Sequence, residues 1–152
     1  MNVGDIAPDF ILKDRLNQEH QLSKIKKIKV LYFYPKDNTP GCTIESKGFS
    51  LMLDEFENLN ATVIGVSGGD NKSKEKFCTS HNLKHVLLSD IDFLVSKEYG
   101  VYGEKSFMGK KYMGISRITF ILDKNNKILK IYENVKPIGH AKEVLNFIKS
   151  LK

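Results

Sequence analysis

The residues whose types and spacing could do chemistry lie in the stretch VLYFYPKDNTPGCTIE at positions 30–45. A strand-like apolar run ends at Pro35, and Cys42 follows in the first turn of an expected helix. A helix N-terminus offers unpaired backbone N–H groups and a partial positive charge, and both favour a thiolate over a thiol. An inert, buried cysteine is the alternative, but the neighbouring Pro, Gly and Thr residues favour a reactive one.

The residue three positions before the cysteine narrows this chemistry. Thioredoxin-like oxidoreductases carry C-x-x-C at such a strand-to-helix junction, whereas this chain reads T-P-G-C, with Thr39 in place of the first cysteine. A local disulfide is therefore excluded. The Thr39 hydroxyl can exchange hydrogen bonds with a small polar substrate, Pro40 can shield the sulfur from water, and Gly41 lets the backbone approach closely. The site suits a small oxidant such as a peroxide.

The elements that must position this site alternate along the chain, which predicts an α/β fold with a central mixed sheet flanked by helices. Ligands of such sheets collect at the carboxyl ends of the strands, where Cys42 falls. No linker is evident, so we expect one domain over residues 1–152. The expected strands are 30–34, 62–67, 86–88, 117–122 and 128–132, and the expected helices are 43–59, 71–81, 93–99 and 139–151.

Composition and charge exclude several classes of protein. The net charge is +6, but the lysines are scattered and only Arg15 and Arg117 are arginines, so we expect a solvated basic surface and no nucleic-acid partner. No apolar run approaches the roughly 20 residues that span a bilayer, and the N-terminus lacks the pattern of a signal peptide. These features predict a cytoplasmic protein with no membrane partner.

The histidines do not indicate a metal site. Cys78, His81 and His85 could be interpreted as ligands, but structural zinc usually takes four ligands in two close pairs, and no second pair is present. We therefore expect no metal and no cofactor. His20 and His140 are expected at the surface.

The chain resembles a known family in several segments. These are VGDIAPDF near the start, PKDNTPGCT around the cysteine, LLSD at 87–90, YGVYGEKSFMGKKYMGISRITFILD at 99–123, and the final amphipathic helix. Together they resemble the AhpC/TSA-like peroxiredoxins, in particular the bacterioferritin-comigratory or peroxiredoxin Q branch, over essentially the whole length. The resemblance implies a thiol peroxidase on a thioredoxin-like fold with an N-terminal extension, without metal or haem.

The resemblance also implies a role for each residue of the motif. Cys42 would be the peroxidatic cysteine, Thr39 would hydrogen-bond the peroxide, and Pro40 would shield the thiolate. Arg117 would be the active-site arginine, and a guanidinium fixed at a strand start can hold a thiolate and polarise a peroxide. The alternative for Arg117 is a solvated edge residue. Glu45 would orient the arginine, with a plain carboxylate on the helix surface as the alternative.

The chain departs from the family pattern in the cysteine that resolves the sulfenic acid. Many members of the branch read C-T-x-x-x-C, but Lys47 stands at that position here. The remaining cysteine is Cys78, and some relatives carry the resolving cysteine on the corresponding helix. We expect an intramolecular Cys42–Cys78 disulfide, formed after the first turns of the Cys42 helix unwind. External thiols, an intermolecular bridge and an inert Cys78 are the alternatives.

The expected function is a peroxidase that reduces hydrogen peroxide and organic hydroperoxides through a Cys42 sulfenic acid. Thioredoxin or a similar thiol protein would be the electron donor, and the chain would be a monomer, with a weak dimer left open. A non-enzymatic peroxide sensor on the same fold is the alternative, but a sensor needs the cysteine alone, without Thr39 and Arg117.

Overall fold

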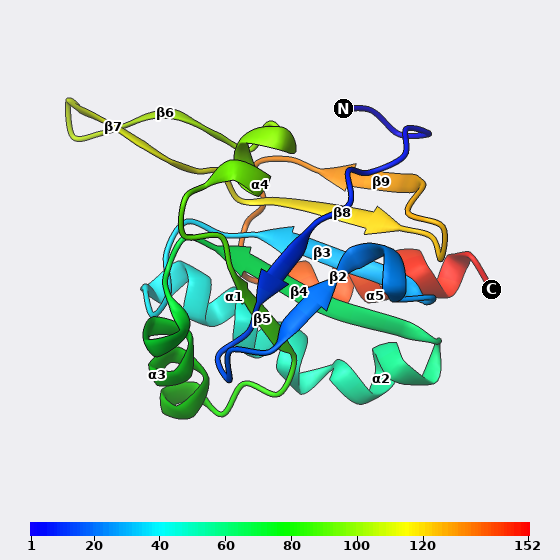
Figure 1. Cartoon of the computed structure of the whole chain (residues 1–152). Coiled ribbons are helices and arrows are strands. Elements are labelled where there is room, and N and C mark those ends of the chain that lie inside the picture. Colours follow the sequence, from blue (N-terminus) through cyan, green and yellow to red (C-terminus); the bar gives the residue numbers. More distant parts are fainter.

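The centre of the molecule is a seven-stranded mixed sheet with helices on both faces (Figure 1). The computed structural model describes residues 1–152. The strand order is β2-β1-β5-β4-β3-β8-β9, in which β3, β4 and β5 run parallel and β8 runs antiparallel to β3. The strands are β1 (Ile11–Lys13), β2 (Glu19–Gln21), β3 (Ile28–Phe33), β4 (Ala61–Ser67), β5 (Val86–Ser89), β8 (Ile118–Leu122) and β9 (Ile128–Tyr132).

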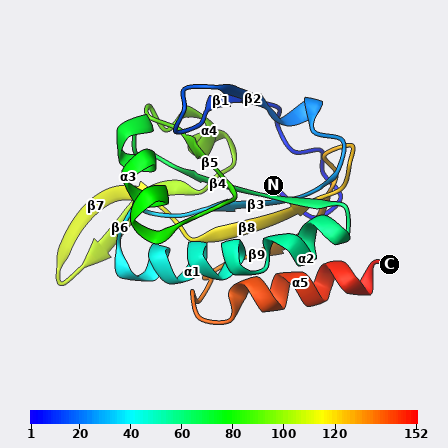
Figure 2. The same cartoon turned by 90° about the horizontal axis from the view of Figure 1, so that it is seen from below.

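Helices cover the two faces of this sheet unequally. One face carries α1, α2, α3 and α5, whereas the other carries the N-terminal segment, a short 3-10 helix, α4 and the base of a separate hairpin (Figure 2). None of the helices combines the length and the hydropathy that a membrane span requires. The helices are α1 (Pro40–Leu51), α2 (Leu53–Asn58), α3 (Asn71–His81), α4 (Leu94–Glu98), α5 (His140–Ser150) and the 3-10 helix (Leu22–Lys24).

The central strand β3 explains the apolar run before the cysteine. Val30 and Tyr32 pack into the core beneath α1, α2, α3 and α5, whereas Leu31 and Phe33 pack into the core on the opposite face. All four side chains are fully buried. A strand covered on both faces needs apolar residues at successive positions instead of alternate ones, and it delivers the chain directly into the loop that precedes Cys42.

Most expected elements are present, and the expected boundaries of α3 are confirmed. The prediction of a single helix over 43–59 is wrong. The chain forms α1 and α2 instead, separated at Met52, whose φ of −101° and ψ of 7° leave the helical region. The first of these helices also begins earlier than expected, at Pro40, because proline is well suited to the first helical position, where no N–H is needed.

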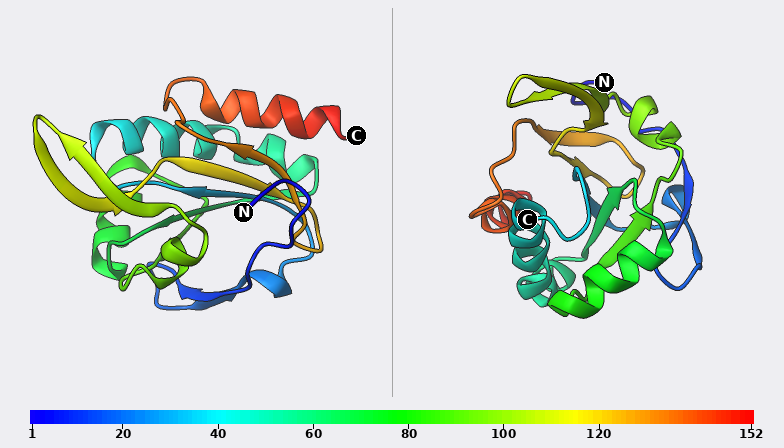
Figure 3. Two further views of the ribbon diagram at one scale, coloured as in Figure 1. Left: turned by 90° about the horizontal axis from the view of Figure 1, so that it is seen from above. Right: turned by 90° about the vertical axis from the view of Figure 1, so that its left-hand side faces the viewer.

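Four short or irregular strands were not predicted. Strands β1 and β2 contain three residues each, too few for a periodic pattern. Strands β6 (Tyr102–Phe107) and β7 (Lys110–Ile115) form a two-stranded hairpin that projects from the body of the molecule (Figure 3). These two strands contain glycines and lysines, which are disfavoured in strands. Residue propensity therefore does not predict the hairpin.

Any side chain at Gly65, in the middle of β4, is expected to destabilise the sheet. A Cβ atom there would lie 2.7 Å from Leu87 Cδ2 and 2.7 Å from Tyr32 Cζ, on the two neighbouring strands. We expect Gly65→Ala to lower the free energy of unfolding by about 1–3 kcal/mol, the usual cost of overpacking a core. Urea unfolding measures this. Gly103→Ala is the matched control, because no atom lies within 4 Å of its Cβ position, and a change there as large would contradict the steric explanation.

Candidate active site

Cys42 lies in the first turn of α1, as the sequence predicts. The extended backbone of Thr39 caps the helix, Pro40 is the first helical residue, and the N–H of Thr43 donates to the Thr39 carbonyl at 2.8 Å. The Cys42 thiol is free and fully buried. It is thus held at the positive end of a helix, beneath the surface of the protein.

Arg117 reaches this sulfur from the sheet. It directly precedes β8, whose Ile118 pairs with Phe33 at the end of β3, so the guanidinium lies beside the loop that carries Cys42. Its Nη1 atom donates to Cys42 Sγ at 3.4 Å, and the side chain is 18% exposed. Gly41 permits this approach, since a Cβ atom there would lie 3.0 Å from Arg117 Nη2. The solvated edge arginine is therefore not what the structure shows.

Glu45 forms the other side of this cluster, three residues after Cys42 on α1. Its Oε1 atom accepts from Arg117 Nη1 at 2.9 Å, and its side chain is fully buried. The alternative of a surface carboxylate is wrong. Burial raises the pKa of Glu45 to about 7, although the Arg117 guanidinium opposes this change. The other carboxylate oxygen, Oε2, has no hydrogen-bond partner.

Arg117 is thus shared between a sulfur and a carboxylate. Burial by itself lowers the pKa of Arg117, but Cys42 and Glu45 more than offset this effect and raise it. A guanidinium has five N–H donors, and these two contacts use only Nη1. The donors on Nη2 and Nε remain for a ligand that reaches the sulfur.

Thr39 and Pro40 precede Cys42 at the start of α1. The Thr39 hydroxyl donates to the Lys36 carbonyl at 3.0 Å, which leaves its oxygen lone pairs free to accept a hydrogen bond. Pro40 is exposed, whereas Cys42, two residues later, is buried. The structure therefore brings together Cys42, Arg117 and Glu45 through direct contacts, and Thr39 and Pro40 directly precede this cluster in the chain at the start of α1.

Comparison with known proteins identifies the family of this site. The model of the AhpC/TSA family matches residues 3–131. The chain is a peroxiredoxin of this family. It is 46% identical over 147 residues to a putative peroxiredoxin Bcp of Helicobacter pylori, and the aligned region covers 95% of this chain and 96% of the relative. It is 40% identical over 152 residues to peroxiredoxin Bcp of Bacillus subtilis, covering 99% of this chain and 97% of the relative.

Solved structures place the peroxiredoxin in the expected branch and on the expected fold. The crystal structure of a Xylella fastidiosa PrxQ mutant matches with a TM-score of 0.94 and 38% identity, covering 99% of this chain and 97% of that one. The Xanthomonas campestris bacterioferritin comigratory protein matches with a TM-score of 0.87 and 34% identity, covering 93% and 91%. The thioredoxin-like α/β fold and the thiol-dependent peroxidase activity expected from the sequence are therefore confirmed.

Cys78 of the peroxiredoxin lies on α3, on the same side of the sheet as Cys42. Both thiols belong to the core between β3 and the helices α1, α3 and α5, and both are free. Cys78 is 3% exposed, and burial raises the pKa of its thiol. It also borders a surface cavity, lined in part by Leu16, Leu83 and Leu87. The two sulfurs share one core but are not joined.

Two histidines of the peroxiredoxin, His85 and His140, lie in the core, and the expectation about one of them is wrong. His85 is buried between Tyr32 and Ser50, each 2.6 Å from one of its ring nitrogens, and burial lowers its pKa to about 3. His140 was expected at the surface but is 3% exposed and contacts Thr119. The signal was present in the sequence, since His140 begins the apolar stripe of α5.

Sequence reasoning also missed a buried ion pair close to the active-site loop. Asp37 lies in that loop, and Lys74 lies on α3. Lys74 is surrounded in the sequence by other lysines, so its composition indicated a solvated helix face. The structure instead turns this one lysine into the core, where its side chain is fully buried.

Proposed function

We propose that Cys42 is the peroxidatic cysteine and that Thr39, Arg117, Glu45 and Pro40 form its catalytic environment. The observation that carries this proposal is the position of Arg117 Nη1, 3.4 Å from Cys42 Sγ and 2.9 Å from Glu45 Oε1. A permanent cation beside a thiol at a helix N-terminus favours the reactive thiolate. Peroxide sensing alone would require the thiol but not this arrangement of donors.

The proposed first step is attack by the Cys42 thiolate on one oxygen of the peroxide. A sulfur–oxygen bond forms as the oxygen–oxygen bond breaks, and the leaving hydroxide or alkoxide takes up a proton to become water or an alcohol. The Thr39 oxygen can accept a hydrogen bond from the peroxide, and the free donors of Arg117 stabilise the charge on the leaving oxygen. Pro40 shields the sulfur, and Glu45 holds Arg117 in place.

The product of this step is a Cys42 sulfenic acid, which we propose is resolved by Cys78. The Cys78 thiolate attacks the sulfenic sulfur, a disulfide forms, and the oxygen leaves as water. Their shared core supports this pairing. Because α1 encloses Cys42, its first turns would unwind before the bond forms. A thioredoxin-like dithiol would then reduce the disulfide. The alternative is a one-cysteine cycle in which an external thiol reduces the sulfenic acid.

The proposed substrates are hydrogen peroxide and organic hydroperoxides. The Xanthomonas campestris bacterioferritin comigratory protein is described as having alkyl peroxide reduction activity, which supports the second class here. We further propose that the enzyme acts as a cytoplasmic monomer. Size-exclusion chromatography of the reduced and oxidised protein tests the oligomeric state.

Intact mass under non-reducing conditions tests the proposed cycle. After one equivalent of hydrogen peroxide, we expect the wild type to lose two hydrogens as the bridge forms. Cys78→Ser is expected to gain one oxygen at Cys42 or to become over-oxidised, because nothing within the chain resolves the sulfenic acid.

Two other outcomes would overturn parts of this proposal. A wild type that gains oxygen without forming a bridge supports the one-cysteine cycle. A wild type that does not react with peroxide contradicts the role of Cys42. Repeated turnover in the presence of thioredoxin and its reductase distinguishes an enzyme from a sensor, which reacts once.

A further inference from the structure

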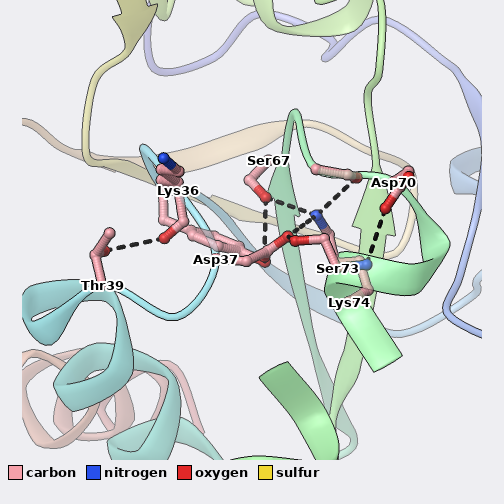
Figure 4. A network of polar contacts seen from close by, with 9 residues as sticks. Lys36, Asp37, Thr39, Ser67, Asp70, Ser73 and Lys74 are labelled. Carbon is pink, nitrogen blue, oxygen red and sulfur yellow. Dashed lines mark hydrogen bonds and ion pairs between the residues drawn. The ribbon is translucent and has the colours of Figure 1, made fainter. Parts of the chain in front are cut away.

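A buried polar network joins the loop before α1 to the start of α3 (Figure 4). Lys74 Nζ donates to Asp37 Oδ2 at 2.9 Å, to Ser67 Oγ at 2.7 Å and to the Gly69 carbonyl at 3.1 Å. The side chains of Lys74 and Asp37 are 0% and 2% exposed. All three donor hydrogens of the ammonium therefore have partners, and none of them is water.

The carboxylate of Asp37 also has hydrogen-bond donors on both of its oxygens. It accepts from Tyr34 at 2.5 Å, from Ser73 Oγ at 2.7 Å and from Ser67 Oγ at 3.2 Å, besides the lysine. Burial lowers the pKa of Lys74, although Asp37 opposes this change. Separating such a pair inside the core would leave two uncompensated charges in a medium of low dielectric constant, so the contact resists opening.

The position of the pair relates it to both cysteines. Asp37 lies five residues before Cys42, and Lys74 lies one helical turn before Cys78 on the same face of α3. Two weaker contacts follow Asp37 and are exposed to water. His81 contacts Asn38 Oδ1 at 2.7 Å, and Thr39 donates to the Lys36 carbonyl at 3.0 Å.

We propose that the Asp37–Lys74 pair is the fixed end of the segment that moves when Cys42 is resolved, and that Lys74 is a positioning residue for the peroxidase. The moving segment begins at Asn38, whose φ of +64° already lies in the left-handed region. Its contacts are exposed and easily exchanged for water, whereas those of Asp37 are not. This inference rests on the proposed roles of Cys42 and Cys78.

An anchor of this kind has a specific kinetic consequence. While the pair is intact, the loop returns to one position and presents Thr39 and Cys42 to the peroxide in the same geometry each time. Without the pair, the loop would present them poorly, and a displacement of about 1 Å can cost about 100-fold in rate. Formation of the disulfide, which requires the loop to open, would not be slowed.

The test compares Lys74→Met with the wild type and with Lys29→Met. Lys29 is the matched control, because its side chain is also fully buried and donates to Asn126 Oδ1 at 2.6 Å, but at the opposite end of β3. One measurement is the second-order rate constant of Cys42 with hydrogen peroxide, by competition with a peroxidase of known rate. The other is the peroxide concentration that over-oxidises half of the Cys42 during turnover, measured by intact mass.

We expect Lys74→Met to lower the rate constant of Cys42 with peroxide by about 10- to 100-fold relative to the wild type. The peroxide concentration that over-oxidises half of the Cys42 should rise by a similar factor. Lys29→Met should leave both quantities within about twofold of the wild-type values, because Lys29 is distant from Cys42 and shares no partner with it. A Lys74→Met rate within twofold of the wild type overturns the proposal. So does an equal loss in Lys29→Met, which would indicate general destabilisation.

A second variant separates positioning from folding. The double variant Asp37→Asn with Lys74→Met removes both charges, so it avoids an uncompensated buried carboxylate and should fold more stably than Lys74→Met alone. We expect its peroxide rate to remain low, since the anchor is still lost, and recovery to the wild-type rate would overturn the proposal. A wild type that reacts but forms no bridge would refute the role of Cys78 and the moving segment, while the rate comparison would still decide the positioning role of Lys74.

Discussion

Arg117→Ala is expected to slow the reaction of Cys42 with peroxide by about 10²–10³-fold, the usual cost of removing one donor that stabilises developing negative charge. The guanidinium is the only cation in contact with Cys42 Sγ, and it lies 18% exposed in a partly desolvated site, where its interactions are stronger than in water. The loss should appear in the second-order rate constant and not in the rate of disulfide formation.

Two further arginine variants sharpen this result. Arg117→Lys keeps the charge but loses the planar guanidinium that contacts Cys42 and Glu45 together. We therefore expect a rate between those of the wild type and Arg117→Ala. Arg15→Ala is the matched control, because Arg15 is more exposed and pairs with Glu75 at 3.4 Å. Stopped-flow competition at neutral pH measures all three. If Arg117→Ala reacted as fast as Arg15→Ala, Arg117 would have no role in the chemistry.

Glu45→Gln is expected to change how the stability of the reduced protein depends on pH. Burial raises the pKa of Glu45 from 4.5 to about 7, so between these values the folded protein holds a proton that the unfolded chain has released. The stabilisation from this proton is complete below pH 4.5 and is lost as the pH rises to about 7. A pKa change of this size corresponds to a change of about 3 kcal/mol in the free energy of unfolding.

The measurement is urea unfolding of the reduced wild type and of Glu45→Gln at pH 5 and at pH 8. Glutamine does not titrate, and it can still accept a hydrogen bond from Arg117. The wild type should therefore lose stability relative to the variant between the two pH values, while the other titrating groups cancel in the difference. A constant difference, or a wild type that gains stability with pH relative to the variant, would contradict the raised pKa.

The position of Cys42 at a helix start and the approach of Arg117 could be predicted from the sequence, because these features of the candidate site are local or chemically distinctive. The T-P-G-C segment sets the helix start, the sulfur and the hydroxyl within four residues, and Arg117 is conspicuous in a chain that uses lysine for nearly every cation. Helix α3 begins and ends where it was predicted, and the structure shows Asp70 capping its start by accepting from the N–H of Ser73. These features depend on short-range physics.

The remaining features depend on contacts between distant segments. The burial of Glu45 follows from Arg117, which lies 72 residues away, and the burial of Lys74 follows from Asp37, 37 residues away. Lys74 does not differ in type from the exposed lysines beside it, and no pattern in the sequence around Glu45 marks its carboxylate as buried. The break at Met52 is equally invisible, because a helical pattern continues on both sides of it. Only the tertiary structure distinguishes these positions.

The complete enclosure of Cys42 has a consequence for the order in which the enzyme meets its two partners. A sulfur with no exposed surface cannot meet another protein in this conformation. In the proposed cycle, a protein reductant would therefore reach the oxidised cysteine only after the start of α1 opens, whereas a small peroxide would need a much smaller opening. The oxidant and the reductant would then bind different conformations of the same segment.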